Sequence, residues 1–106
     1  MSTAQKRLET KIDKIRKTLM SLGPMRPGSI GKQFRNPKEK TRPFYQLSYT
    51  HRMKSRSEYV RPENLKALQR ETAAFKRFRA LIDTWVDLAL ELSQLRIRKG
   101  GGGGRR

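Results

Sequence analysis

The feature that most constrains the fold of this chain is a narrow apolar stripe near its N-terminus. Leucine and isoleucine recur there at spacings of four, three, four and three residues, at Leu8, Ile12, Ile15, Leu19 and Leu22. On an α-helix these spacings place all five side chains on one face. The stripe therefore predicts a helix over residues 3–22, ended by Gly23-Pro24. Its apolar face is typical of a helix that packs against another helix, as in a coiled coil.

A second apolar pattern predicts a long helix over residues 62–99, which begins at Pro62-Glu63. Its distal part, residues 80–95, contains three acidic residues and no Lys or Arg. A surface that faces phosphates is not expected there. We expect this part to form an oligomer or helix–helix seam, made of Phe78, Ile82, Trp85, Ala89 and Leu92.

The segment between the two helices has the alternation of a β-hairpin, which we place at residues 42–61. Polar residues and Phe44 alternate there with Tyr45, Leu47 and Tyr49. These three residues therefore share one face of a strand, and we expect that face to cover the helices. The fold class predicted is mainly α with a small antiparallel β-hairpin (α+β), arranged as one helix–hairpin–helix domain over residues 1–99. The aromatic residues that are candidates for stacking on bases are Phe34, Phe44 and Tyr49.

Two further segments lack helical or strand periodicity. Residues 23–41 are punctuated by Gly and Pro, which predicts a loop or a basic arm that becomes ordered on its ligand. Residues 100–106 are five glycines followed by two arginines, a composition typical of a flexible tail.

Positive charge dominates the composition and concentrates in the middle of the chain. Lys and Arg number 26 against nine Asp and Glu, a net charge of +17. Residues 23–61 alone hold ten basic and two acidic residues. Such a field attracts nucleic acid, and the planar guanidinium group suits phosphate and guanine. The candidate nucleic-acid contacts are Arg26, Lys32, Arg35, Lys38, Lys40, Arg42, Arg52, Lys54, Arg56 and Arg61.

Little in the sequence indicates catalysis. His51 is the only histidine and there is no cysteine, so we expect no enzyme activity, metal site or cofactor. No apolar run approaches the roughly 18 residues that span a bilayer. We therefore expect a cytoplasmic protein without a membrane partner.

Three functions fit these features. The leading hypothesis is a non-enzymatic accessory protein that binds DNA mainly through phosphate contacts and shape, as a homo-oligomer. The first alternative is an RNA-binding subunit of a ribonucleoprotein, because structured RNA would suit the same surface. The second alternative belongs to another class, a helical interaction protein that docks on an acidic protein partner.

The chain also resembles a family of short, uncharacterised, basic bacterial proteins that are often encoded beside transposases. The segments that carry the resemblance are LMSLGPMRPGSI (19–30), PFYQLSYT (43–50), SEYVRPENL (57–65) and FKRFRALIDTWVDLALEL (75–92). The resemblance implies the helix–hairpin–helix order, a mobile-element setting and a transposon-encoded protein as a partner. Members commonly carry a cysteine cluster where this chain has GKQFRNPKEKTR (31–42). Because this segment contains no cysteine, we expect no metal-binding role for it in this chain.

Overall fold

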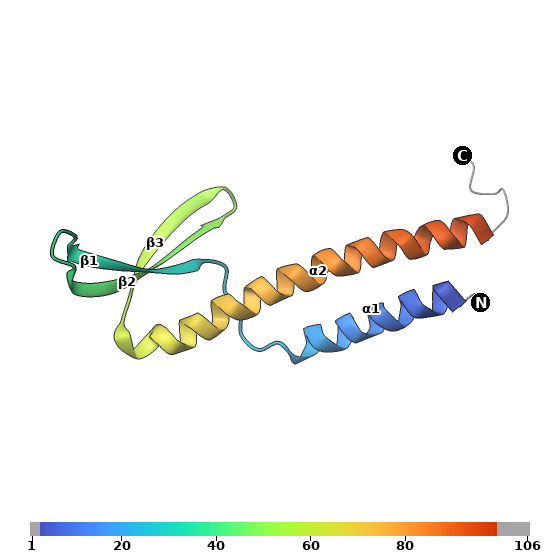
Figure 1. Cartoon of the computed structure of the whole chain (residues 1–106), viewed down its shortest axis with the longest axis horizontal. Helices are drawn as coiled ribbons and strands as arrows, with labels where there is room; N and C mark the ends of the chain where they lie inside the picture. The colour runs from blue at the N-terminus through green and yellow to red at the C-terminus, as the bar shows by residue number, and fades with distance from the viewer. Residues whose placement is uncertain (1–2, 100–106) are drawn as a thin grey trace. The chain divides into compact units, whose positions relative to one another are not determined.

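The computed structural model describes residues 3–99 and has an α+β architecture, as predicted (Figure 1). It is 58% helical and 27% strand. The elements in chain order are α1 (Thr3–Ser21), β1 (Ser29–Asn36), β2 (Thr41–His51), β3 (Lys54–Val60), a 3₁₀ turn (Pro62–Asn64) and α2 (Leu65–Lys99). The predicted tail, residues 100–106, lies outside the described residues.

The chain divides into two compact units. The helical unit contains residues 3–22 and 78–99 of the described chain, and the sheet unit contains residues 23–77. Helix α2 contributes to both. Within the described residues, neither helix combines the length and apolarity that crossing a membrane requires.

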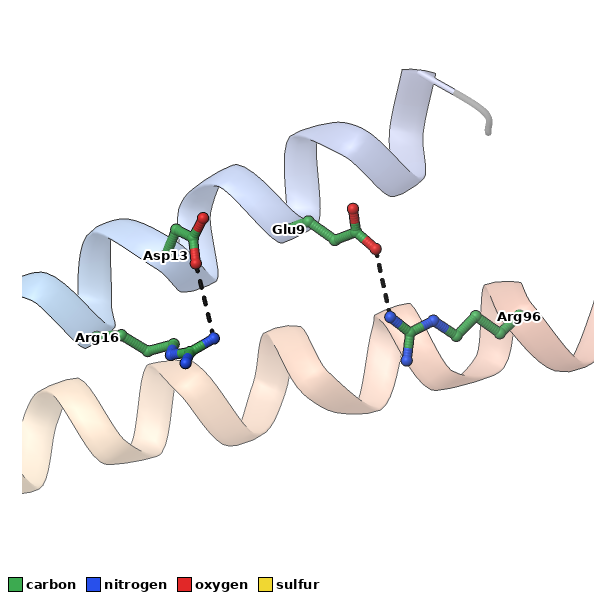
Figure 2. A network of polar contacts seen from close by, with 4 residues as sticks. All are labelled: Glu9, Asp13, Arg16 and Arg96. Atoms are coloured by element: carbon green, nitrogen blue, oxygen red, sulfur yellow. Dashed lines mark hydrogen bonds and ion pairs between the residues drawn. The ribbon is translucent and has the colours of Figure 1, made fainter.

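In the helical unit, the predicted N-terminal stripe packs against α2 of the same chain. Leu8, Ile12 and Leu92 are buried together, and Trp85 is among the partly buried residues that pack against them. Complete burial of a large apolar side chain contributes about 1.5–3 kcal/mol, so these contacts hold the two helices together. An ion pair also joins them, with 3.3 Å between Arg96 Nη2 and Glu9 Oε2 (Figure 2). It is largely exposed and contributes little to stability.

Polar contacts on α1 itself are also weak. Arg16 Nη1 lies 3.7 Å from Asp13 Oδ1, three residues earlier in the same helix, with both side chains exposed (Figure 2). Such pairs stabilise a helix by a few tenths of a kcal/mol. Apolar burial, rather than charge pairing, therefore stabilises the helical unit.

The sheet unit contains a three-stranded antiparallel sheet in the order β1-β2-β3. The central strand β2 pairs Leu47 with Ile30 on one side and with Glu58 on the other. Leu47 is completely buried, and Val60 and Thr72 are buried as well. A backbone hydrogen bond of 3.0 Å from the Arg26 N–H to the Glu71 carbonyl oxygen ties the segment before β1 to α2.

The expectation of a loop or basic arm over residues 23–41 was wrong for the centre of that segment. β1 occupies its centre and extends the predicted hairpin to three strands. Ile30 and Phe34 are partly buried, whereas Gly31 and Lys32 between them are exposed. A strand with so few apolar residues is stabilised by its ladder with β2, which no local pattern reveals.

The hairpin itself is confirmed, and a tight turn joins its two strands. His51 of β2 pairs with Lys54 of β3, so the turn consists of Arg52 and Met53 alone. Their φ angles are +52° and +66°. Positive φ at both residues of a two-residue turn is the geometry of a type I′ turn.

Candidate nucleic-acid interface

The strand register separates the sheet into two faces. One face, the closed face, carries Leu47 and Val60, which are 0% and 3% exposed. Side chains alternate along a strand, so Phe44 and Gln46 lie on the opposite, open face. Tyr59 pairs directly with Gln46 and belongs to the open face too; it is 57% exposed. The open face is therefore accessible to a ligand.

Two aromatic rings and a guanidinium group meet on the open face. The ring centroids of Phe44 and Tyr59 are 6.5 Å apart at an interplanar angle of 37°. The guanidinium carbon of Arg35 lies 5.1 Å from the Phe44 centroid. Aromatic rings and guanidinium planes are the groups on which unpaired bases stack. This arrangement, which we call the aromatic platform (Arg35, Phe44 and Tyr59), can therefore bind bases as well as phosphates.

Tyr49 and Arg26 are engaged in a different cluster, on the closed side of the sheet. The Arg26 guanidinium carbon lies 5.1 Å from the Tyr49 centroid, and Arg26 Nη2 donates to Glu58 Oε2 at 2.8 Å. The Tyr49 hydroxyl donates to the same carboxylate oxygen at 3.0 Å. These contacts already occupy one face of the Tyr49 ring and part of the Arg26 guanidinium group. Both residues therefore brace the sheet more than they offer a binding surface.

The electrostatics of this cluster agree with a structural role. The hydrogen bond from Arg26, followed by that from Tyr49, lowers the pKa of the Glu58 carboxyl below its usual value. Partial burial disfavours the charged form of Arg26, but the hydrogen bond and charge of Glu58 outweigh it and raise the pKa of the guanidinium. Both groups are therefore charged at neutral pH, and Arg26 brings little unneutralised charge to the surface.

Phe34, the third predicted stacking residue, lies on the closed side of β1, two residues from Lys32. The Lys32 ammonium nitrogen is 5.5 Å from the Phe34 centroid. Phe34 is partly buried and Lys32 exposed. The structure therefore separates the three predicted stacking residues: Phe44 lies on the open face, and Phe34 and Tyr49 do not.

Most of the remaining predicted contacts gather at the two turns of the sheet. Lys38, Lys40 and Arg42 are exposed in or beside the β1–β2 turn, and Arg52, Lys54 and Arg56 are exposed in or beside the β2–β3 turn. Arg61 is exposed directly after β3. Of the ten predicted basic contacts, Arg26 is the one that forms an ion pair within residues 3–99. Cations near both turns are thus left to meet an external anion.

Serine and threonine side chains brace the β2–β3 hairpin between these cations. The hydroxyl oxygens of Ser48 and Ser57 are 3.3 Å apart, and those of Thr50 and Ser55 are 3.0 Å apart. Each pair lies directly across the two strands. Cross-strand hydroxyl pairs of this kind stabilise a hairpin. All four remain exposed, so their second lone pairs and protons are accessible to phosphate or water.

An open cleft of about 530 Å³ lies beside this hairpin, within the sheet unit. Its lining includes Gly28, Tyr49, Arg56, Phe75 and Lys76. Two cations of this lining, Arg56 and Lys76, suit a phosphate group. Lys76 was not among the predicted contacts, because it lies in the predicted long helix and outside the basic segment of residues 23–61.

Tyr59 is the main residue that the sequence prediction missed. It was not among the predicted stacking residues, because its partner Phe44 lies fifteen positions away and only the strand register brings the two rings together. A strict alternation count along residues 54–60 would have placed Tyr59 on the face opposite Val60.

Among residues 3–99, no three His, Asp or Glu side chains lie close enough together to hold a metal ion.

Comparisons with models of known protein families, with curated proteins and with solved structures find no match to this chain. The resemblance to transposase-associated proteins therefore stays a prediction. The geometry and the charge of the sheet unit are the features that indicate a function.

Proposed function

We propose that this chain is a non-enzymatic nucleic-acid-binding accessory protein, which binds DNA mainly through phosphate contacts made by the sheet unit. The observation that carries the proposal is the unneutralised charge of residues 23–61. Both acids of this segment have partners, Glu58 in Arg26 and Glu39 in the Asn36 side chain, which donates at 3.1 Å. The other nine basic residues have no carboxylate within ion-pair distance among residues 3–99. Such a surface releases counterions when it binds a polyanion.

One observation favours a second candidate, an RNA-binding subunit of a ribonucleoprotein. The aromatic platform presents Tyr59 and Phe44 beside Arg35 on an open sheet face. Sequence-specific RNA recognition commonly uses bases splayed onto aromatic residues of a sheet. Duplex DNA does not offer its bases in this way.

The partner of the helical unit is proposed to be a second copy of the chain. Val86, Leu90 and Ile97 of α2 are each more than half exposed, and their spacing places them on one helix face. Val86 and Leu90 lie within residues 80–95, which carry acids and no bases. A second copy that presents the same helix face would bury these apolar side chains against one another in a two-fold interface. A cytoplasmic location and a transposon-encoded partner remain part of the proposal and rest on the sequence alone.

Binding measured across salt tests the proposal. Fluorescence anisotropy is measured with a short DNA duplex, the corresponding single strand and a structured RNA. For each of them, the logarithm of the association constant should fall linearly with the logarithm of the salt concentration. The expected slope is about 0.9 per phosphate contacted on duplex DNA. Tighter binding to RNA at equal salt would select the RNA-binding alternative. An affinity for all three that is weak and independent of salt would place the chain among helical interaction proteins instead.

A further inference from the structure

The β2–β3 hairpin extends beyond the rest of the sheet. The last paired position of β1 is Ser29 with Ser48, whereas β2 and β3 remain paired from Tyr45 to His51 on the β2 side. Past Ser48 the hairpin is therefore a two-stranded ribbon, drawn in yellow-green in Figure 1. Every residue from 50 to 59 is exposed. A narrow ribbon of this kind fits a groove of duplex DNA.

An apolar side chain occupies the end of this ribbon. Met53 is 97% exposed, more than any other large apolar residue described. A fully exposed methionine contributes nothing to the core of the sheet unit. It is flanked by Arg52 and Lys54, and residues 50–57 contain no acid. The tip thus combines a long apolar side chain with cations on both sides.

The backbone at the tip is not the one that Arg and Met favour. The left-handed region is unfavourable for residues with a Cβ atom, and two-residue type I′ turns strongly prefer Asn-Gly. Arg52 and Met53 nevertheless adopt φ angles of +52° and +66°. An Asn-Gly turn would close the same hairpin with less strain. Strained turns of this kind are found preferentially where the side chains that they carry have a function.

We propose that the hairpin is a groove-binding arm and that Met53 is its wedge, which inserts between neighbouring base pairs of duplex DNA and bends the duplex. Proteins that enter the minor groove insert Met and other apolar side chains in this way and kink the DNA by about 20–90°. Arg52, Lys54 and Arg56 bind phosphates on the two sides of the groove. The cross-strand hydroxyl pairs Ser48–Ser57 and Thr50–Ser55 stiffen the arm. The inference rests on the proposed DNA binding and adds its mode.

The first experiment measures bending. A duplex much shorter than the persistence length of about 150 base pairs behaves as a stiff rod, so dyes at its two ends report a kink as increased energy transfer. We expect wild-type protein to increase the transfer and Met53→Gln to remove most of the increase. Met20→Gln is the matched control, because Met20 is 87% exposed on α1 and distant in sequence from the arm. It should bend DNA as the wild type does.

The second measurement compares matched and mismatched duplexes. A mismatched step is easier to unstack, so a wedge gains affinity there. Wild-type protein should prefer the mismatched duplex by about tenfold, because part of the unstacking cost is already met. Met53→Gln should lose that preference.

A glycine variant separates the wedge from the fold. Met53→Gly suits the positive φ angle and should retain or raise the melting temperature while it abolishes bending. If Met53→Gly and Met53→Gln bend DNA as strongly as the wild type, the wedge is excluded. If wild-type protein binds the duplex with the expected salt dependence and leaves it straight, the inference fails while the proposed function stands. If it binds no nucleic acid, both fail.

Discussion

Gly28 shows how a single residue determines the geometry of the sheet unit. Its φ angle is +135°, and a Cβ atom there would lie 2.8 Å from Leu47 Cδ1 and 2.9 Å from the Ser48 carbonyl oxygen. Leu47 is the one fully buried large side chain described. The chain can therefore turn into β1 at this point only because the residue has no side chain.

We predict that Gly28→Ala lowers the free energy of unfolding by about 2–4 kcal/mol, from backbone strain and overpacking together. Gly31→Ala is the matched control, because nothing lies within 4 Å of its added Cβ. It should leave stability unchanged or raise it by up to about 0.5 kcal/mol. Urea unfolding followed by circular dichroism measures both. Equal losses of unfolding free energy in the two variants would show that the close contacts at Gly28 do not determine the cost of replacing it.

The Arg26–Glu58–Tyr49 cluster predicts a pH dependence. Because the folded state lowers the pKa of Glu58 below the usual value of 4.5, the unfolded state binds the proton more readily. Its contribution to stability is therefore present above pH 4.5 and is lost as the pH falls through the lowered pKa. The melting temperature of Glu58→Gln should be lower than that of the wild type at neutral pH. The two should converge in acid, and a constant difference down to low pH would contradict this assignment.

At the scale of elements, the sequence predicts what short-range patterns encode. The stripe from Leu8 to Leu22 predicts α1 because every member lies within one or two turns of the next, and the alternation around Leu47 predicts β2 in the same way. The sequence does not predict β1, because the pairing of β1 with β2 is not encoded in a local pattern. It does not predict the aromatic platform for a similar reason, since Phe44 and Tyr59 meet only through the β2–β3 register.

The seam between α1 and α2 gives an energetic prediction at this scale. Leu92→Ala should lower the free energy of unfolding of the helical unit by about 2–5 kcal/mol, because it leaves a cavity against Leu8 and Ile12. Met20→Ala, at an exposed site on α1, should change it by no more than about 0.5 kcal/mol. Thermal unfolding of the two variants provides the comparison. Similar melting temperatures would mean that the seam does not stabilise the unit.

At the scale of the whole molecule, apolar surface and charge are assigned to different parts of the chain. The helical unit exposes Val86, Leu90 and Ile97 beside an acidic edge, and the basic residues of the sheet unit cluster near its turns. This division predicts that association and nucleic-acid binding can be altered separately.

Leu90→Glu places a charge on the exposed face of α2, which is 58% exposed at this residue. It should convert a dimer to a monomer in sedimentation experiments without loss of helix content. Met20→Glu should leave the mass unchanged. A wild-type chain that sediments as a monomer at all concentrations would rule out the second copy as partner of the helical unit.

The central claim is that the sheet unit, rather than the helices, binds the phosphates. The most direct test compares two triple alanine variants that remove equal charge. One replaces Arg52, Lys54 and Arg56 in the hairpin, and the other replaces Lys11, Lys14 and Lys17, which are exposed on α1.

The measurement is the slope of log affinity for duplex DNA against log salt. The hairpin variant should lose up to about 3 units of slope, if each side chain contacts one phosphate, and the α1 variant should keep the wild-type slope. An unchanged slope in the hairpin variant, with a reduced slope in the α1 variant, would contradict the account and assign binding to the helices.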